Sequence, residues 1–83
     1  MHLEILTPEK KIFEGDVTIV TFPGSDGSFQ VMNNHAPLVS LLKDGTVVYK
    51  SKEGTEQVKI TGGVVEVLKN NVIVLADGIN YNS

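Results

Sequence analysis

The 83-residue sequence contains no cysteine. Without cysteine the chain can form neither a disulfide framework nor a thiolate metal site, and the absence fits a reducing compartment. A long apolar run is also missing, since none approaches the roughly 20 residues that a membrane-spanning helix needs. The N-terminal residues MHLEILTPEKK lack the charged-then-apolar order of a signal peptide. We therefore expect a soluble, unexported chain that reaches a membrane only through a partner.

Basic residues are in short supply as well. Seven Lys and Arg stand against ten Asp and Glu, which gives a formal net charge of −3. A nucleic-acid-binding protein needs a surplus of positive charge against phosphate, and so does a protein whose main partner is an anionic membrane surface. The few aromatic residues are scattered rather than placed beside basic residues, where they could stack on bases. The composition therefore predicts no nucleic-acid partner.

Helical periodicity is almost absent, and a period of two takes its place. The best helical candidate, PLVSLLK, is long enough for only one or two turns. Alternating or β-branched segments such as VTIVTF, EQVKIT, GVVEVL and VIVLA are bounded by the turn residues PG, KDG, KEG and GG. One domain over residues 1–83, built as an all-β antiparallel sandwich or barrel without significant helix, is the expected fold.

Two local expectations follow from the strand patterns. A fully apolar segment such as VIVLA should be buried on both faces, whereas EQVKIT should show one face to water. Asn70-Asn71 separates two apolar segments, and asparagine tolerates positive φ. This pair is therefore predicted to form a two-residue hairpin turn.

Residues that could carry chemistry are few. His35 could act as a general base, with Ser40 and Asp26 as its nearest candidate partners in the sequence. No nucleophile-elbow motif accompanies it. The favoured interpretation is that His35 caps a turn or packs against Pro37 and hydrogen-bonds to the backbone.

Metal and cofactor motifs are not recognisable either. No carboxylates show the spacing of a calcium loop, and no His, Asp and Glu group shows that of a zinc site. The glycine-rich stretches GSDGS and TGGVV do not match a phosphate-binding loop. Glu66 lies between Val65 and Val67 in an apolar segment, and alternation predicts that it faces solvent. We predict no cofactor and no enzymatic activity.

The stretch NNHAPLVSLL is the main anomaly. Leu38, Val39, Leu41 and Leu42 place four large aliphatic residues in five positions. A strand would bury only alternate members of such a run. Either a short helical turn buries all four, or some stay exposed until a partner covers them. Each leucine covered in this way contributes about 1.5–3 kcal/mol.

Two long stretches carry a family resemblance. FPGSDGSFQVMNNHAPLVSLLKDGTV, followed by ITGGVVEVLKNNVIVLAD, closely resembles the N-terminal domain of the epsilon subunit of the F-type ATP synthase, called delta in mitochondria. The match covers nearly the whole chain. The resemblance implies a flattened antiparallel β-sandwich of about ten short strands. It also implies a non-catalytic rotor subunit that joins the gamma subunit to the ring of c subunits and couples ion-driven rotation to ATP synthesis.

The resemblance also implies where the partners bind. Two loops, residues 24–29 and 33–42, are expected at one end of the sandwich as the surface that meets gamma and the ring. The residues carried over are Ser25, Asp26, Ser28, Asn33, Asn34, His35, Ala36, Pro37, Leu38, Val39, Leu41 and Leu42. The starting methionine without a transit segment favours a bacterial chain, bound peripherally at the cytoplasmic face of the cell membrane within the complex.

Two departures from the family pattern matter. Many relatives have an acidic residue where this chain has Ser28, so an ion pair with the ring would have to come from Asp26 or elsewhere. Family members commonly continue into a C-terminal helical hairpin that inhibits ATP hydrolysis, whereas this chain ends six residues after Asp77. A naturally short form without that helical domain is expected.

Two other classes of function remain open from the residues alone. A free-standing β-sheet binding module would need a concave apolar pocket for a small ligand. A small hydrolase that uses His35 would lose turnover when this histidine is replaced. The sequence favours the rotor subunit because it offers an apolar surface for binding and no constellation for a reaction.

Overall fold

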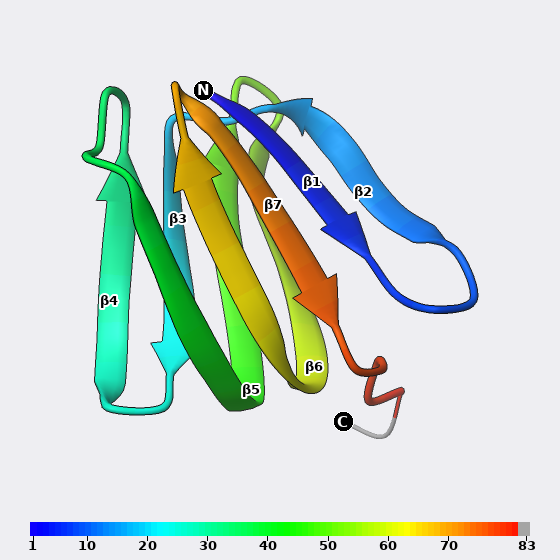
Figure 1. Cartoon of the computed structure of the whole chain (residues 1–83). Coiled ribbons are helices and arrows are strands. Elements are labelled where there is room, and N and C mark those ends of the chain that lie inside the picture. Colours follow the sequence, from blue (N-terminus) through cyan, green and yellow to red (C-terminus); the bar gives the residue numbers. More distant parts are fainter. Residues whose placement is uncertain (82–83) are drawn as a thin grey trace.

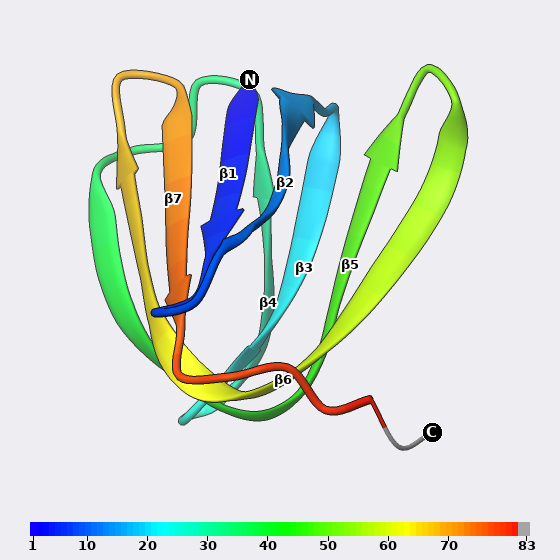
Figure 2. The same cartoon turned by 90° about the vertical axis from the view of Figure 1, so that its right-hand side faces the viewer.

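A computed structural model describes residues 1–81, and in that range it contains seven β-strands and no helix. The strands form one sheet in the order β2-β1-β7-β6-β5-β3-β4, which folds over into two layers (Figures 1 and 2). Among the described residues no helix is long and apolar enough to cross a membrane. The predicted all-β sandwich is confirmed. The strands are β1 (His2–Leu6), β2 (Lys11–Asp16), β3 (Ile19–Gly24), β4 (Gly27–Met32), β5 (Leu38–Ser51), β6 (Gly54–Leu68) and β7 (Asn71–Ala76).

The difference between about ten expected strands and the seven observed lies in β5 and β6. They contain 14 and 15 residues, and each runs through a glycine-containing stretch where the sequence predicts a break. The ladder between them continues across the bend, with Leu42 opposite Gly63 and Asp44 opposite Thr61. Figure 2 shows this hairpin curving round the lower end of the molecule, so that one ribbon belongs to both layers.

A close backbone approach explains why glycine occupies position 63. Gly63 has a φ of 148°, in the region that residues with a side chain rarely adopt. A Cβ atom at this position would lie 2.3 Å from the carbonyl oxygen of Leu75 on β7. Glycine therefore allows β6 to bend while β7 stays paired beside it.

Two details of pairing differ from the sequence prediction. β1 and β7 run parallel, while every other pair of neighbouring strands is antiparallel. Strand β7 lies between β6 and β1 in the sheet. The chain reaches β7 only after β2 to β6, and it then runs in the same direction as β1. The β6–β7 turn is centred on Lys69-Asn70, one residue earlier than predicted, because Leu68 pairs with Asn71. Both turn residues have positive φ, at 51° and 64°.

The core lies between the two layers. Each layer contributes the inward residues of its strands, in the period of two that the sequence displays. No polar or charged side chain among the described residues is buried, so apolar burial holds the layers together. The first layer supplies Leu3, Ile5, Val65, Val67, Val72 and Val74, and the second supplies Val20, Phe22, Val31, Val47, Tyr49 and Ile60.

Candidate functional site

The two loops predicted to form one surface lie at opposite ends of β4. Ser25 and Asp26 form the turn that enters the strand, and Asn33 and Asn34 form the turn that leaves it. Figure 1 shows the first turn at the bottom of the molecule and the second at the top. A six-residue strand spans about 20 Å. The expectation of one shared end is therefore wrong, because strand β4 separates the two turns along its whole length.

The lower turn is linked instead to the far part of the aliphatic run. The backbone N–H of Ser25 donates a hydrogen bond to the carbonyl oxygen of Leu41 at 3.0 Å. Ser25 also lines an open hollow together with Leu41, Leu6, Leu75 and other residues from β1, β5, β6 and β7. Ser28 lies beyond the turn on β4 and is exposed. The structure thus brings Ser25 to Leu41 and Leu42, and separates Ser28 from His35.

The aliphatic run itself is a strand and not a helical turn. Leu42 is buried and Leu38 is half-buried, whereas Val39 and Leu41 are each 68% exposed. The helical interpretation is wrong because Leu38 already pairs with Val67 as the first residue of β5. The alternation of a strand leaves two of the four aliphatic side chains in solvent.

These exposed residues belong to a larger apolar row. Leu41 lies opposite Val64, Val64 lies opposite Leu75, and Leu75 lies opposite Leu6. Residues directly opposite each other in a ladder project from the same face of the sheet. Leu75 is 50% exposed, which corrects the expectation that VIVLA is buried on both sides. The row crosses four strands in the front layer of Figure 1.

A second row lies beside the first and extends the same face. It consists of Val39, Glu66, Ile73 and Glu4 on the same four strands. Glu66 is exposed, as predicted. We name the apolar members of both rows the outer apolar face, which consists of Leu6, Val39, Leu41, Val64, Ile73 and Leu75. Val39, Leu41 and Leu75 are exposed, whereas Leu6, Val64 and Ile73 are half-buried.

The upper loop is held by asparagine side chains. The Oδ1 atom of Asn70 accepts a hydrogen bond from the backbone N–H of Asn34 at 2.9 Å. The Oδ1 atom of Asn33 accepts one from the amino group of Met1 at 2.7 Å. Ala36 and Pro37 are exposed at the tip. These two bonds fix the start of the loop against the β6–β7 turn and β1.

Among residues 1–81, the hydrogen bonds of His35 all go to the backbone. Its Nδ1 atom lies 2.7 Å from the carbonyl oxygen of Ala36, and its backbone N–H donates to the carbonyl oxygen of Met32 at 3.2 Å. This confirms the predicted hydrogen bonding of the histidine to the backbone. Ser40 donates its hydroxyl to the carbonyl oxygen of Leu41. Within the part of the chain that the structure describes, no three His, Asp or Glu residues could share a metal ion.

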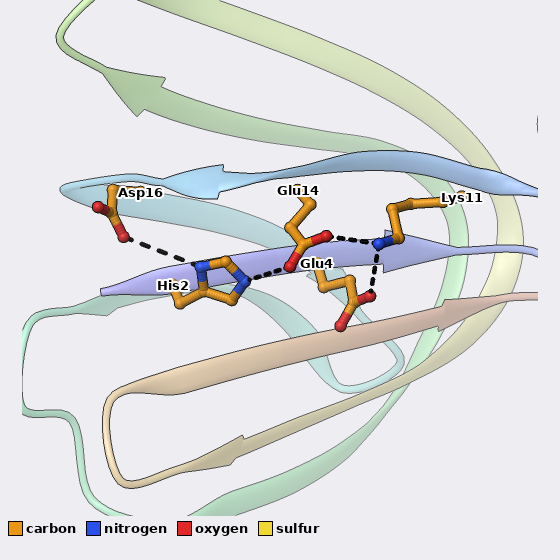
Figure 3. A network of polar contacts seen from close by, with 5 residues as sticks. All are labelled: His2, Glu4, Lys11, Glu14 and Asp16. Carbon is orange, nitrogen blue, oxygen red and sulfur yellow. Dashed lines mark hydrogen bonds and ion pairs between the residues drawn. The ribbon is translucent and has the colours of Figure 1, made fainter.

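Charged side chains form a network beside the outer apolar face, on β1 and β2 (Figure 3). The His2 ring bonds Glu14 through Nε2 at 2.9 Å, and its Nδ1 lies 3.9 Å from Asp16. Lys11 bridges Glu14 and Glu4, the latter at 3.4 Å. Hydrogen bonds from Lys11 and then His2 lower the pKa of Glu14, and the bond to Glu14 is the largest cause that raises the pKa of Lys11. Glu4 and Glu14 therefore share the ammonium group of Lys11 at this edge.

Comparison with known sequences identifies the family. The family described as the β-sandwich domain of the ATP synthase delta/epsilon chain matches residues 1–81. The chain belongs to this family. An ATP synthase epsilon chain of Campylobacter fetus is 50% identical over 82 residues, which cover 98% of this chain and 64% of that one. The ATP synthase epsilon chain of Chlorobium limicola is 43% identical over 79 residues, which cover 94% of this chain and 90% of that one.

Solved structures of ATP synthases contain the same fold. A chain in the central stalk and c-ring structure of the Tetrahymena thermophila mitochondrial ATP synthase superposes with a TM-score of 0.81 at 19% identity, covering 95% of this chain and 64% of that one. A chain of the Euglena gracilis mitochondrial enzyme superposes with a TM-score of 0.86 at 21% identity, covering 94% and 51%. The chain spans a little under two thirds of the length of several curated relatives that it matches.

Within this delta/epsilon β-sandwich domain, sequence reasoning found only the β5 part of the outer apolar face. It missed four members, which lie on three other strands. The signal for three of them was the excess of apolar residues in GVVEVL and VIVLA, and the sequence analysis assigned VIVLA to burial on both faces. Only the strand register shows that their outward side chains form one surface. The missed residues are Leu6, Val64, Ile73 and Leu75.

Proposed function

We propose that this chain is a non-catalytic rotor subunit of the F-type ATP synthase, which joins the gamma subunit to the c-ring. In this role it couples ion-driven rotation to ATP synthesis. The observation that carries the proposal is the outer apolar face, on which Val39, Leu41 and Leu75 are exposed among half-buried aliphatic neighbours. The family membership of the chain supports the same role, since the relatives are named as ATP synthase epsilon chains.

The outer apolar face suits the gamma subunit. A joint that must last through rotation needs apolar burial at its centre, and each leucine covered contributes about 1.5–3 kcal/mol. Leu41 and Leu75 are the most prominent side chains of the long row. The polar lower turn, with Ser25, Asp26 and the adjacent Ser28, suits the polar surface of the ring instead. The upper loop, Asn33 to Pro37, stays a predicted contact with either partner.

The mechanism is mechanical. The c-ring turns, and torque reaches gamma only if the body between them does not shear. Because β5 and β6 pair from Leu38 and Val67 to Ser51 and Gly54, one hydrogen-bonded ribbon crosses both layers. Displacing one layer against the other would strain this ribbon. A stiff body bound on two sides therefore transmits rotation without any chemical step of its own.

In this proposal the chain needs no cofactor, metal, small-molecule substrate or nucleic acid. It meets the membrane only through the complex, at the cytoplasmic face of a bacterial cell membrane. Relatives from bacteria, including Campylobacter fetus and Chlorobium limicola, support that location. A composition with net charge −3 also gives no reason for direct contact with anionic lipid.

Binding to gamma tests the proposal. The 83-residue chain is immobilised and offered the catalytic complex of the same source after removal of its own copy. We expect retention of the complex by the wild-type chain and loss of retention by Val39→Asp with Leu41→Asp. Thr55→Asp, on an exposed position of β6 in the other layer, serves as the control and should still bind. Failure of the wild-type chain to bind would refute the proposed function.

A further inference from the structure

Glu66 occupies an unusual position on the outer apolar face. On β6 it lies directly between Val39 of β5 and Ile73 of β7. The neighbouring row on the same side of the sheet is the apolar row of Leu41, Val64 and Leu75. A carboxylate therefore stands between aliphatic residues on both neighbouring strands, while its other side borders a hollow that His2, Glu4, Lys69 and Asn71 also line.

This carboxylate differs from the others on the same side of the sheet. Glu4 pairs with Lys11, and Glu14 pairs with both Lys11 and His2. Glu66 makes no ion pair and no hydrogen bond with any side chain of residues 1–81. Lys69 lines the same hollow as Glu66 without forming an ion pair with it. The Glu66 side chain is thus exposed to solvent without a side-chain partner in residues 1–81.

Covering the face would remove that water. Burying an ionised carboxylate without a partner carries a large desolvation penalty, while a well-placed cation restores the lost interaction. Binding of a purely apolar partner to this face would therefore carry the desolvation penalty of Glu66. It would favour a partner that presents a positive charge at one defined point, and such pairs set the register and choice of partner.

We infer that the partner of the outer apolar face places a lysine or arginine side chain opposite Glu66, inside an otherwise apolar contact. Glu66 is the specificity-determining residue of this interface, and the aliphatic residues around it supply the binding free energy. The inference rests on the proposed function, in which the partner is the gamma subunit. It adds the chemistry by which gamma is recognised and the point at which its cation sits.

The test compares three single variants in the same binding assay as a function of salt. Glu66→Gln removes the charge and keeps the shape. Glu56→Gln makes the same change on the same strand, in the other layer, and is the matched control. Leu41→Asp reports on the aliphatic part of the face. Salt is raised from about 0.1 M to about 1 M, which shortens the Debye length from about 10 Å to about 3 Å.

We expect Glu66→Gln to weaken binding by roughly 30-fold or more, since the partner's cation is left buried and unpaired. Glu56→Gln should bind like the wild type. The salt dependence of binding should be weaker for Glu66→Gln than for the wild type. Thermal midpoints of the free chains should be equal, because Glu66 is exposed and without a partner there.

The outcomes separate this inference from the proposed function. If Leu41→Asp weakens binding and Glu66→Gln binds as tightly as the wild type with the same salt dependence, gamma covers the face without a cation and the inference is overturned. The inference also fails if both variants bind normally. If the wild-type chain does not bind gamma at all, the proposed function fails first.

Discussion

Leu41 of β5 and Leu75 of β7 both lie opposite Val64 of β6, so that residues 34 positions apart in the chain form one exposed aliphatic row. Neither leucine is covered by the described chain, at exposed fractions of 68% and 50%. A free sheet face of this kind is typical of an interaction surface. Its existence links the strand register directly to the proposed rotor role.

The far end of this row provides the first prediction. Leu75→Asp should weaken binding to the gamma-containing complex by roughly 10- to 150-fold, because covering a leucine contributes about 1.5–3 kcal/mol. Isothermal titration measures the change. Leu75 lies outside both loops predicted from the sequence, so normal binding by this variant would restrict the contact to β5. Thr55→Asp is again the control.

Replacement of Gly63 should cost stability. Gly63→Ala places a methyl group against the Leu75 carbonyl and combines this clash with an unfavourable φ, so we expect a loss of about 2–4 kcal/mol in the free energy of unfolding. Urea denaturation measures it. Gly27→Ala is the matched comparison: φ is 129° there, but a Cβ atom meets nothing within 4 Å. Equal losses at both positions would show that the contact with β7 is unimportant.

The β6–β7 turn offers a stabilising change. Lys69 has a φ of 51° at the first central position of a two-residue hairpin, where asparagine is preferred. Lys69→Asn should therefore raise the free energy of unfolding by about 0.5–1 kcal/mol. Chemical denaturation would detect this as a higher midpoint at an unchanged slope. A lower midpoint would contradict the assignment of the turn.

Asn70 should control the mobility of the upper loop. Asn70→Gly keeps the positive φ and removes the acceptor of the Asn34 N–H. A hydrogen bond of this kind contributes about 0.5–1.5 kcal/mol, so the Asn34 amide should exchange about 2- to 12-fold faster. Hydrogen exchange followed by NMR measures it. Asn70→Asp retains an acceptor and should leave the rate close to that of the wild type.

The Glu14 network predicts a direction for the effect of acid. Lys11 and His2 hold the pKa of Glu14 in the folded state below its ordinary value of 4.5. Their interaction with the carboxylate therefore adds stability above the unfolded pKa. That contribution is lost as the pH falls through the folded pKa. The wild type should therefore have a higher thermal midpoint than Glu14→Gln at neutral pH, and this advantage should vanish in acid. A difference that persists at low pH would refute the linkage.

The fold class was predictable from the sequence because the period of two is a local property of each strand. EQVKIT displays it without reference to the rest of the chain, with Val58 and Ile60 alternating with polar residues. The number of strands was not predictable in the same way. The stretches KDG and GG can either end a strand or bend it. Here the strands bend and stay paired, with Gly63 packed closely against the backbone of Leu75.

The site was predictable only where its residues are neighbours in the sequence. The aliphatic excess at Leu38 to Leu42 is visible in one short window, and two of its members are exposed. The rest of the outer apolar face depends on which residues of β6, β7 and β1 stand opposite one another, which is a property of long-range pairing. The parallel pairing of β1 with β7 places Leu6 at the end of the row, and no local pattern reveals it.

The bent β5–β6 ribbon determines how the molecule would yield under load. A pull directed along the ribbon meets its hydrogen bonds side by side, so many must rupture together before the strands slide. A pull that separates the two strands at the open end of the hairpin, at Leu38 and Val67, would instead break these hydrogen bonds one after another. A rotary joint built on this chain would therefore withstand twisting that loads the ribbon lengthwise, and its weakest direction would be peeling from the open end at Leu38 and Val67.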